Sequence, residues 1–181
     1  MPKIEPNEKK PAARIEAALA TPTDLRSTGT AIIARELNML VADAFALYVK
    51  TKNFHWHMSG PHFRDYHLLL DEQAAQILAS IDPLAERVRK LGQRTIVSLA
   101  QISELASIED NLEAFVPPER MLQILTGDNK AMAENLRRVH GICDENHDPA
   151  TASLLEAFID ETERRTWFLF ETSRPAGAKG H

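Results

Sequence analysis

Two pairs of potential metal ligands stand at a spacing of four residues in one segment of the sequence. His67 and Asp71 form the first pair, and Asp82 and Glu86 form the second. On a helix, residues i and i+4 are neighbours on one face, so each pair projects two donor groups from the same stripe. Imidazole nitrogen with carboxylate oxygen suits iron, with zinc, manganese and cobalt as competitors. The spacing therefore predicts a metal site of mixed nitrogen and oxygen ligands.

One straight helix cannot bring both pairs to the same ion. Eleven residues separate Asp71 from Asp82, which corresponds to about 16 Å at the helical rise per residue. An antiparallel copy of the helix, related by a two-fold axis near Gln76 or Ile77, would lay the second pair of one chain beside the first pair of another. The geometry predicts a homo-oligomer with a metal site shared between two chains.

A third imidazole belongs to the preceding helical segment. His55 comes shortly before Ser59-Gly60-Pro61, where Gly60 can end one helix and Pro61 suits the first position of the next. The turn would fold the next helix back, so that His55 joins His67 and Asp71 at one end of the fold. The alternative is that all these side chains are solvated residues of helix faces, where most polar residues lie.

The elements that must position these residues are helices. Apolar residues recur at helical spacing in four segments, about 30–57, 62–91, 118–143 and 150–172, and no convincing length alternates with period two. A short extra helix is expected over 98–106, inside a long connection that lets the second and third helices run parallel. Pro83 predicts a kink rather than a break. The predicted fold class is therefore all-α, a four-helix bundle over 29–172, with a flexible arm over 1–28 and a flexible tail over 173–181.

Composition narrows the class of protein. The chain has 181 residues, a formal charge of −5 and 44% hydrophobic residues, as expected for one soluble globular domain. Neither a membrane-spanning nor a secretory apolar segment is present. The single cysteine, Cys143, rules out an internal disulfide framework, suits a reducing compartment, and is expected to be buried. The acidic balance lacks the basic footprint of a typical nucleic-acid binder.

A run of residues in the first half of the chain forms a specific signature: His55-Trp56-His57-Met58-Ser59-Gly60, Phe63, His67, Leu70-Asp71, Asp82 and Ala85-Glu86-Arg87. This signature resembles that of the Dps-type miniferritins, the DNA-binding proteins of starved cells. The resemblance runs from about Leu37 to Arg174 and includes 148–155 and the aromatic segment 166–170. Larger ferritins build an iron site inside one bundle from Glu-x-x-His motifs, and this chain contains none.

The resemblance implies a ferritin-like subunit, with the short extra helix, that assembles into a hollow dodecamer in the bacterial cytoplasm or nucleoid. It implies ferroxidase centres at two-fold interfaces, where ferrous iron is oxidised mainly by hydrogen peroxide and stored as ferric mineral. The ligands would be His55, His67 and Asp71 of one subunit, with Asp82 and Glu86 of its mate. Zinc is an expected surrogate. Trp56 would supply an electron and limit radical release, or else be a core or interface aromatic.

The resemblance also implies DNA as a partner, which the charges leave open. Basic residues of the arm, Lys3, Lys9, Lys10 and Arg14, are offset by Glu5, Glu8 and Glu16. Twelve subunits at −5 each would carry about −60, so arms that only aid solubility are the alternative, although many weak arms would gain avidity.

Three further expectations concern the main role of the protein, the entry of cations and the histidines beside the proposed site. One is that the protein mainly packs the nucleoid and has a weak or non-iron metal site. Another is that Asp144, Glu145 and Asp148 form an acidic funnel at a three-fold pore, which would focus cations. His57 and His62, which flank the proposed site, are either surface residues or aids to iron entry.

Overall fold

The computed structural model describes residues 19–174, and in this range the chain is entirely helical apart from its connections. The elements are α2 (Ser27–His57), α3 (Phe63–Lys90), α4 (Leu99–Leu105), α5 (Pro118–Glu145) and α6 (Pro149–Thr172). Four long helices and one short helix in the long connection confirm the predicted all-α architecture. Most of the expected arm and tail, 1–18 and 175–181, lies outside the described residues, so the predicted division into three parts stays a prediction.

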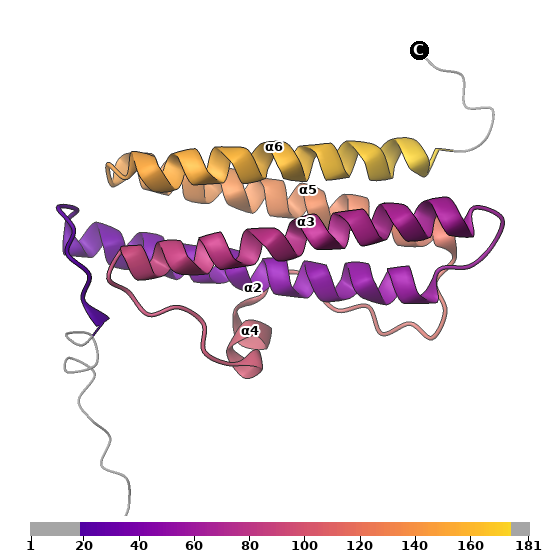
Figure 1. Ribbon diagram of the computed structural model, residues 1–181, viewed down its shortest axis with the longest axis horizontal. Helices are drawn as coiled ribbons and strands as arrows, with labels where there is room; N and C mark the ends of the chain where they lie inside the picture. The colour runs from indigo at the N-terminus through magenta and orange to yellow at the C-terminus, as the bar shows by residue number, and fades with distance from the viewer. Residues whose placement is uncertain (1–18, 175–181) are drawn as a thin grey trace, which may run out of the picture.

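The long helices form two hairpins that pack into a bundle. Figure 1 shows α2 beside α3 and α5 beside α6, with α4 resting against α2 on the outside. Leucine, isoleucine, valine and methionine side chains from all four long helices fill the interior, together with Phe54 of α2. The long connection crosses the bundle and carries α4, so α5 starts at the end where α2 finishes (Figure 1). This topology brings the α2–α3 turn and the first half of α3 together at one end.

Local sequence signals define the helix ends. Gly60 adopts φ +98° in the turn between α2 and α3, and Gly92 adopts φ +76° directly after α3; both lie in the left-handed region that glycine tolerates best. Ser98 caps α4 by accepting a hydrogen bond from the backbone N–H of Gln101 at 3.2 Å. Pro83 lies inside α3, which continues past it to Lys90. The prediction that proline would not break this helix is confirmed.

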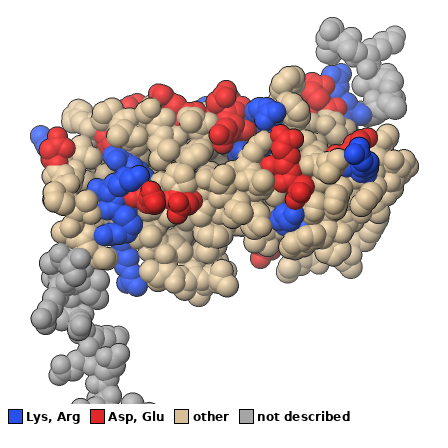
Figure 2. Space-filling view, in the orientation of Figure 1, with Lys and Arg blue, Asp and Glu red and all other residues tan. Residues whose placement is uncertain are grey.

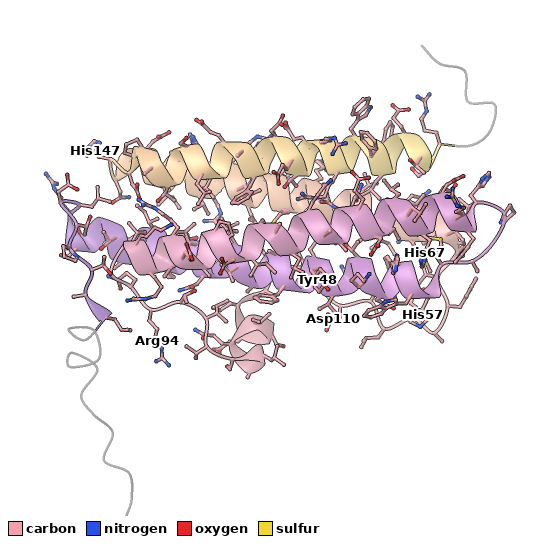
Figure 3. All side chains as sticks on the ribbon, viewed as in Figure 1. Tyr48, His57, His67, Arg94, Asp110 and His147 are labelled. Carbon is pink, nitrogen blue, oxygen red and sulfur yellow. The ribbon has the colours of Figure 1, made fainter. Side chains whose placement is uncertain are left out.

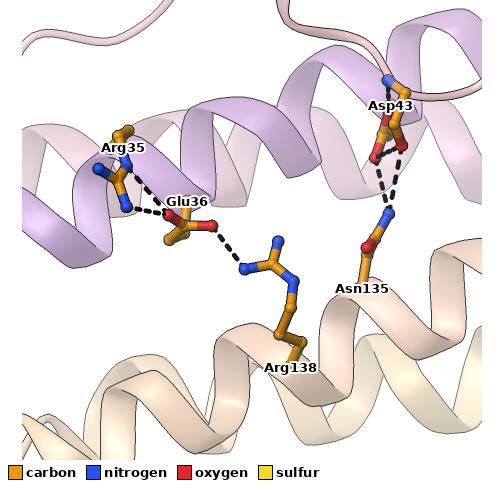
Figure 4. A network of polar contacts seen from close by, with 6 residues as sticks. Arg35, Glu36, Asp43, Asn135 and Arg138 are labelled. Carbon is orange, nitrogen blue, oxygen red and sulfur yellow. Dashed lines mark hydrogen bonds and ion pairs between the residues drawn. The ribbon is translucent and has the colours of Figure 1, made fainter.

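A buried carboxylate fixes the long connection to the bundle. Asp43 of α2 is 2% exposed and accepts hydrogen bonds from the backbone N–H groups of Ser107 at 2.5 Å and Ile108 at 3.3 Å. Its second oxygen accepts from the Ser107 hydroxyl and from the Asn135 amide of α5 (Figure 4). Since buried backbone donors are costly to leave unpaired, Asp43 supports the return of the chain after α4.

A second polar layer occupies the middle of the bundle. Lys50 of α2 lies 2.8 Å from the Asp128 carboxylate of α5, and the buried Arg165 of α6 donates to the Asn129 side chain at 2.9 Å. Burial lowers the pKa of Arg165 to about 10. At this level the interior thus carries two cations, Lys50 and Arg165, beside the Asp128 carboxylate.

Candidate metal centre

The last turn of α2 and the first turns of α3 bring two histidines face to face. The rings of His55 and His67 stack with centroids 3.7 Å apart and planes inclined by 23°. His55 Nδ1 lies 2.9 Å from the carbonyl oxygen of His67, and His67 Nδ1 lies 3.0 Å from the carbonyl oxygen of His55. A carbonyl oxygen can only accept, so each Nδ1 carries the proton. With its proton on Nδ1, the neutral form of each ring has an Nε2 lone pair available for a metal ion.

This reciprocal pairing is the arrangement that metal-binding histidines need. A carbonyl partner on one ring nitrogen fixes the tautomer and the orientation of the other, ligating nitrogen. His55 is 7% exposed, so its ring is held by packing as well as by the hydrogen bond. Figure 3 shows His67 at the end of the bundle where α2 turns into α3. The sequence predicted that both histidines lie at this end, and the structure brings them together.

Asp71 completes a half-site on the same chain. Its Oδ1 lies 3.9 Å from His55 Nε2, so the carboxylate faces the ligating side of that ring. The same oxygen accepts a hydrogen bond from Lys52 Nζ at 2.8 Å. The hydrogen bond and the charge of Lys52 hold the pKa of the Asp71 carboxyl below its usual range. Asp71 is therefore kept ionised, but the ammonium group of Lys52 already binds its Oδ1.

Sequence reasoning missed Lys52. The signal was its position: it lies three residues before His55 and four before Trp56, on the same stripe of α2. Its ammonium group lies 5.8 Å from the centroid of the Trp56 ring, within the range of a cation–π contact. Trp56 is 64% exposed. In this chain it is a surface aromatic next to the half-site, so the alternative of a core position for Trp56 is wrong.

The second acidic pair lies farther along α3 and faces solvent. Both Asp82 and Glu86 are exposed, and Glu86 lies 3.3 Å from Lys90. Within residues 19–174, no three metal-binding side chains are close enough to hold an ion. The single chain thus pairs His55 with His67 and places Asp71 beside His55, in a group too open to hold an ion by itself, and it leaves Asp82 and Glu86 apart from them. The assignment of all five as ligands stays a prediction.

The outward face of α3 between the two pairs is small and apolar. Ala75, Leu78 and Ala79 are exposed and follow Asp71 at helical spacing toward Asp82, and Leu78 is 46% exposed. Small side chains let helices approach closely, and an exposed apolar stripe is typical of a face that another chain covers. A two-fold axis near Gln76 would pass through this stripe.

The acidic turn between α5 and α6 differs from the expectation. Asp148 is 1% exposed, accepts a hydrogen bond from Arg87 at 2.7 Å, and caps α6 by accepting from the Thr151 N–H at 3.0 Å. The prediction that it belongs to an exposed acidic funnel is wrong, because its oxygens are committed to the cap and the ion pair. Asp144 and Glu145 are exposed, so they remain available for such a role.

The remaining histidines are divided between the two ends of the bundle. His57 and His62 are exposed near the half-site, and His147 lies at the opposite end (Figure 3). His140 was given no role from sequence, yet its ring nitrogens lie 3.3 Å from Asp144 and 3.2 Å from Glu156. Because the two carboxylates approach opposite sides of the ring, this contact joins α5 to α6 rather than forming a site for one ion.

Comparison with known proteins settles the family. A family model, the ferritin-like domain, matches residues 34–173. The DNA protection during starvation protein of Brevibacillus brevis is 35% identical over 138 residues, which are 76% of this chain and 92% of that protein. This chain is a Dps-type miniferritin of the ferritin-like family. A low temperature-induced protein of Nostoc sp. is 36% identical over 74% of this chain and 75% of that protein.

Solved structures agree with this assignment. The crystal structure of a Dps protein from Bacillus brevis aligns with a TM-score of 0.79 and 31% identity, covering 83% of this chain and 100% of that chain. The miniferritin resemblance and the ferritin-like fold expected from sequence are both confirmed. Across the described part of this miniferritin, no helix combines the length and apolarity needed to cross a membrane.

Proposed function

We propose that this miniferritin is a ferroxidase whose metal site is shared between two copies of the chain. His55, His67 and Asp71 of one copy would bind ferrous iron together with Asp82 and Glu86 of the other. The observation that carries the proposal is the reciprocal Nδ1–carbonyl pairing of the two histidines. It leaves two Nε2 lone pairs on one half-site, which has too few ligands without a neighbouring chain.

The donor set suits oxidation of the bound iron. Carboxylates neutralise Fe(II) and stabilise Fe(III) better still, while the imidazoles hold the geometry. Two ferrous ions supply the two electrons that reduce one hydrogen peroxide to water, with two protons taken from solvent. Lys52 binds Asp71 Oδ1, the oxygen that faces His55 Nε2, so iron that binds through this oxygen would displace Lys52. The ferric product would be stored inside a hollow dodecamer, in the bacterial cytoplasm or nucleoid.

Mixing two inactive variants tests whether the site is shared. One variant carries His55→Ala and His67→Ala, and the other carries Asp82→Asn and Glu86→Gln. In a two-fold dimer of the two, one site would have every ligand and the other would keep only Asp71. We expect refolded mixtures to regain part of the wild-type rate of ferrous oxidation by peroxide. Mixing His55→Ala with His67→Ala, the matched control, should regain nothing. If neither mixture regains activity, the shared site is wrong.

DNA protection is a second candidate role, suggested by the name of the Brevibacillus relative. The charge distribution supports it: Figure 2 shows lysine and arginine gathered at the end of α3, beside the point where the arm leaves the bundle. A gel-shift assay at low and physiological salt, with and without residues 1–20, tests an arm-based contact. A protein that assembles normally and compacts DNA but does not accelerate ferrous oxidation by peroxide would favour the packing role instead.

A further inference from the structure

A cavity of about 420 Å³ lies at the end of the bundle where α2 begins, at the opposite end from His55 and His67 of the same chain. Its floor is apolar and made of small or aliphatic side chains, Ala31 and Ala34 of α2 and Leu105 of α4. Its rim is polar and carries Arg35, Arg94 and Gln101. Concave sites of this volume, with an apolar lining and a few convergent polar groups, are typical of small-molecule binding.

The charge around the cavity is positive although the chain as a whole is acidic. No aspartate or glutamate is among its lining residues in the described part of the chain. Arg35 donates from Nε and one terminal nitrogen to Glu36, and Arg138 binds the other oxygen of that carboxylate at 2.6 Å (Figure 4). Glu36 thus faces two guanidinium groups, and the second terminal nitrogen of Arg35 has no partner within residues 19–174.

Two more arginines add to this charge. Arg94 projects from the segment after α3 on the side of α4 (Figure 3), and it forms no ion pair with the described residues. Arg89 donates only to the carbonyl oxygens of Gln93 and Leu19, so its charge is not neutralised by a carboxylate either. The bond to Leu19 also holds the residue that forms one wall of the cavity. Arg94 thus lines the cavity without a carboxylate partner among the described residues, and Arg35 shares the carboxylate of Glu36 with Arg138.

We propose that this cavity binds a small organic phosphate. A guanidinium group presents parallel N–H donors that match phosphate oxygens, and charge-assisted bonds of this kind are among the strongest in proteins. Arg35 and Arg94 would hold the phosphate at the rim. The alanine floor leaves room for an apolar or aromatic body, which inorganic phosphate lacks. Neither arginine is one of the five proposed metal ligands, and neither lies near His55 or His67 of the same chain.

Calorimetric titration of the full-length assembly with adenosine 5′-monophosphate, in metal-free buffer, tests the proposal. We expect saturable binding, and we expect Arg35→Gln and Arg94→Gln each to weaken it about tenfold or more. Ala31→Leu should weaken binding as well, since it fills the floor without changing the charge. Arg64→Gln, which removes an exposed arginine at the opposite end of α3, is the matched control and should leave binding unchanged. Adenosine without phosphate should not bind.

Four results would overturn the proposal. The first three are an absence of saturable binding of adenosine 5′-monophosphate, equal weakening of binding by Arg64→Gln and Arg94→Gln, and undiminished binding to Ala31→Leu. A fourth is binding of a DNA duplex through Arg35 and Arg94 when adenosine 5′-monophosphate does not bind, which would make the rim a contact for nucleic acid. Ferrous oxidation by the same variants should equal that of the wild type, so failure here would be distinguishable from failure of the ferroxidase proposal.

Discussion

His55 and His67 hold each other in place: their rings stack at 3.7 Å, and each Nδ1 donates to the backbone carbonyl of the other residue. The two residues stand twelve positions apart and belong to different helices. Their contact therefore ties the end of α2 to the start of α3 and at the same time orients both Nε2 atoms. The same bonds serve the fold and the proposed chemistry.

Removing one member of this pair should damage iron binding more than it damages the fold. His67→Ala deletes a proposed ligand and leaves His55 without the stacked ring that positions it. Loss of an orienting partner alone typically costs about 10–100-fold in metal affinity, so at least that loss is expected. Anaerobic titration with Fe(II) measures it. His147→Asn is the control, since His147 is exposed and adopts φ 58°, which asparagine tolerates. Equal affinity in His67→Ala and wild type would contradict the assignment.

Lys52 should compete with iron for Asp71. In Lys52→Met the carboxylate loses its ammonium partner, and its pKa should return upward toward the ordinary value. Asp71 would still be ionised at pH 7, so the net effect is removal of a competing cation. We expect Fe(II) to bind about two- to fivefold more tightly, the range of an exposed ion pair. Lys130→Met on α5 controls for the change in net charge. Weaker binding by Lys52→Met would show that the lysine assists iron instead.

Asp43 should be the most sensitive polar residue of the long connection. Asp43→Ala would leave the backbone N–H groups of Ser107 and Ile108 without their acceptor. A loss of about 2–4 kcal/mol in the free energy of unfolding is expected, measured by urea denaturation. Asp110→Ala removes an exposed carboxylate from the same connection and should change stability by less than about 0.5 kcal/mol. A stable Asp43→Ala variant would mean that the connection is held by other contacts.

Because of Glu36, part of the free energy of unfolding should be lost at acid pH. Burial alone would raise the pKa of Glu36, but hydrogen bonds and charges from Arg138 and Arg35 outweigh it and hold the pKa below 4.5. A group with a lowered folded pKa stabilises the fold above its unfolded pKa, and this contribution is lost as pH falls through the folded value. Unfolding measured from pH 7 to pH 3 should show this loss in wild type and in Glu134→Gln, but less of it in Glu36→Gln. Identical pH profiles of stability in all three proteins would contradict the assignment of this loss to Glu36.

Cys143 should be chemically inert in the folded protein. The side chain is fully buried, and burial raises the pKa of its thiol to about 12. Because the thiolate is the reactive form, a thiol reagent at pH 8 should modify native protein only as fast as it unfolds. Denatured protein should react at once with one thiol per chain. Rapid labelling of native protein would show that this part of α5 opens locally.

Local patterns were enough to predict the helices and the half-site. Apolar periodicity placed each long helix within a few residues of its observed bounds, and Gly60 stands at the turn with the positive φ that its residue type suggested. The separation of Asp71 from Asp82 along α3 follows from helical rise alone. These features depend on residues near one another in sequence, which is why sequence reasoning reaches them.

Features that depend on a distant partner were missed or misjudged. Lys52 meets Asp71 across nineteen residues, and Asp148 meets Arg87 across sixty-one. The sequence alone does not distinguish an acidic turn residue that is buried as a helix cap from one that is exposed in a funnel. Its burial is decided by a helix far away in the chain. His140 was given no role from sequence, because its contact with Glu156 joins two different helices.

Anomalous scattering from crystals soaked in ferrous iron tests the central claim most directly. The shared-site account predicts an iron peak within coordination distance of His67 Nε2 and of the carboxylates of Asp82 and Glu86 from a neighbouring chain, with Lys52 moved off Asp71. Iron bound by ligands of one chain alone, or found only inside the bundle near Asp128, would contradict the account.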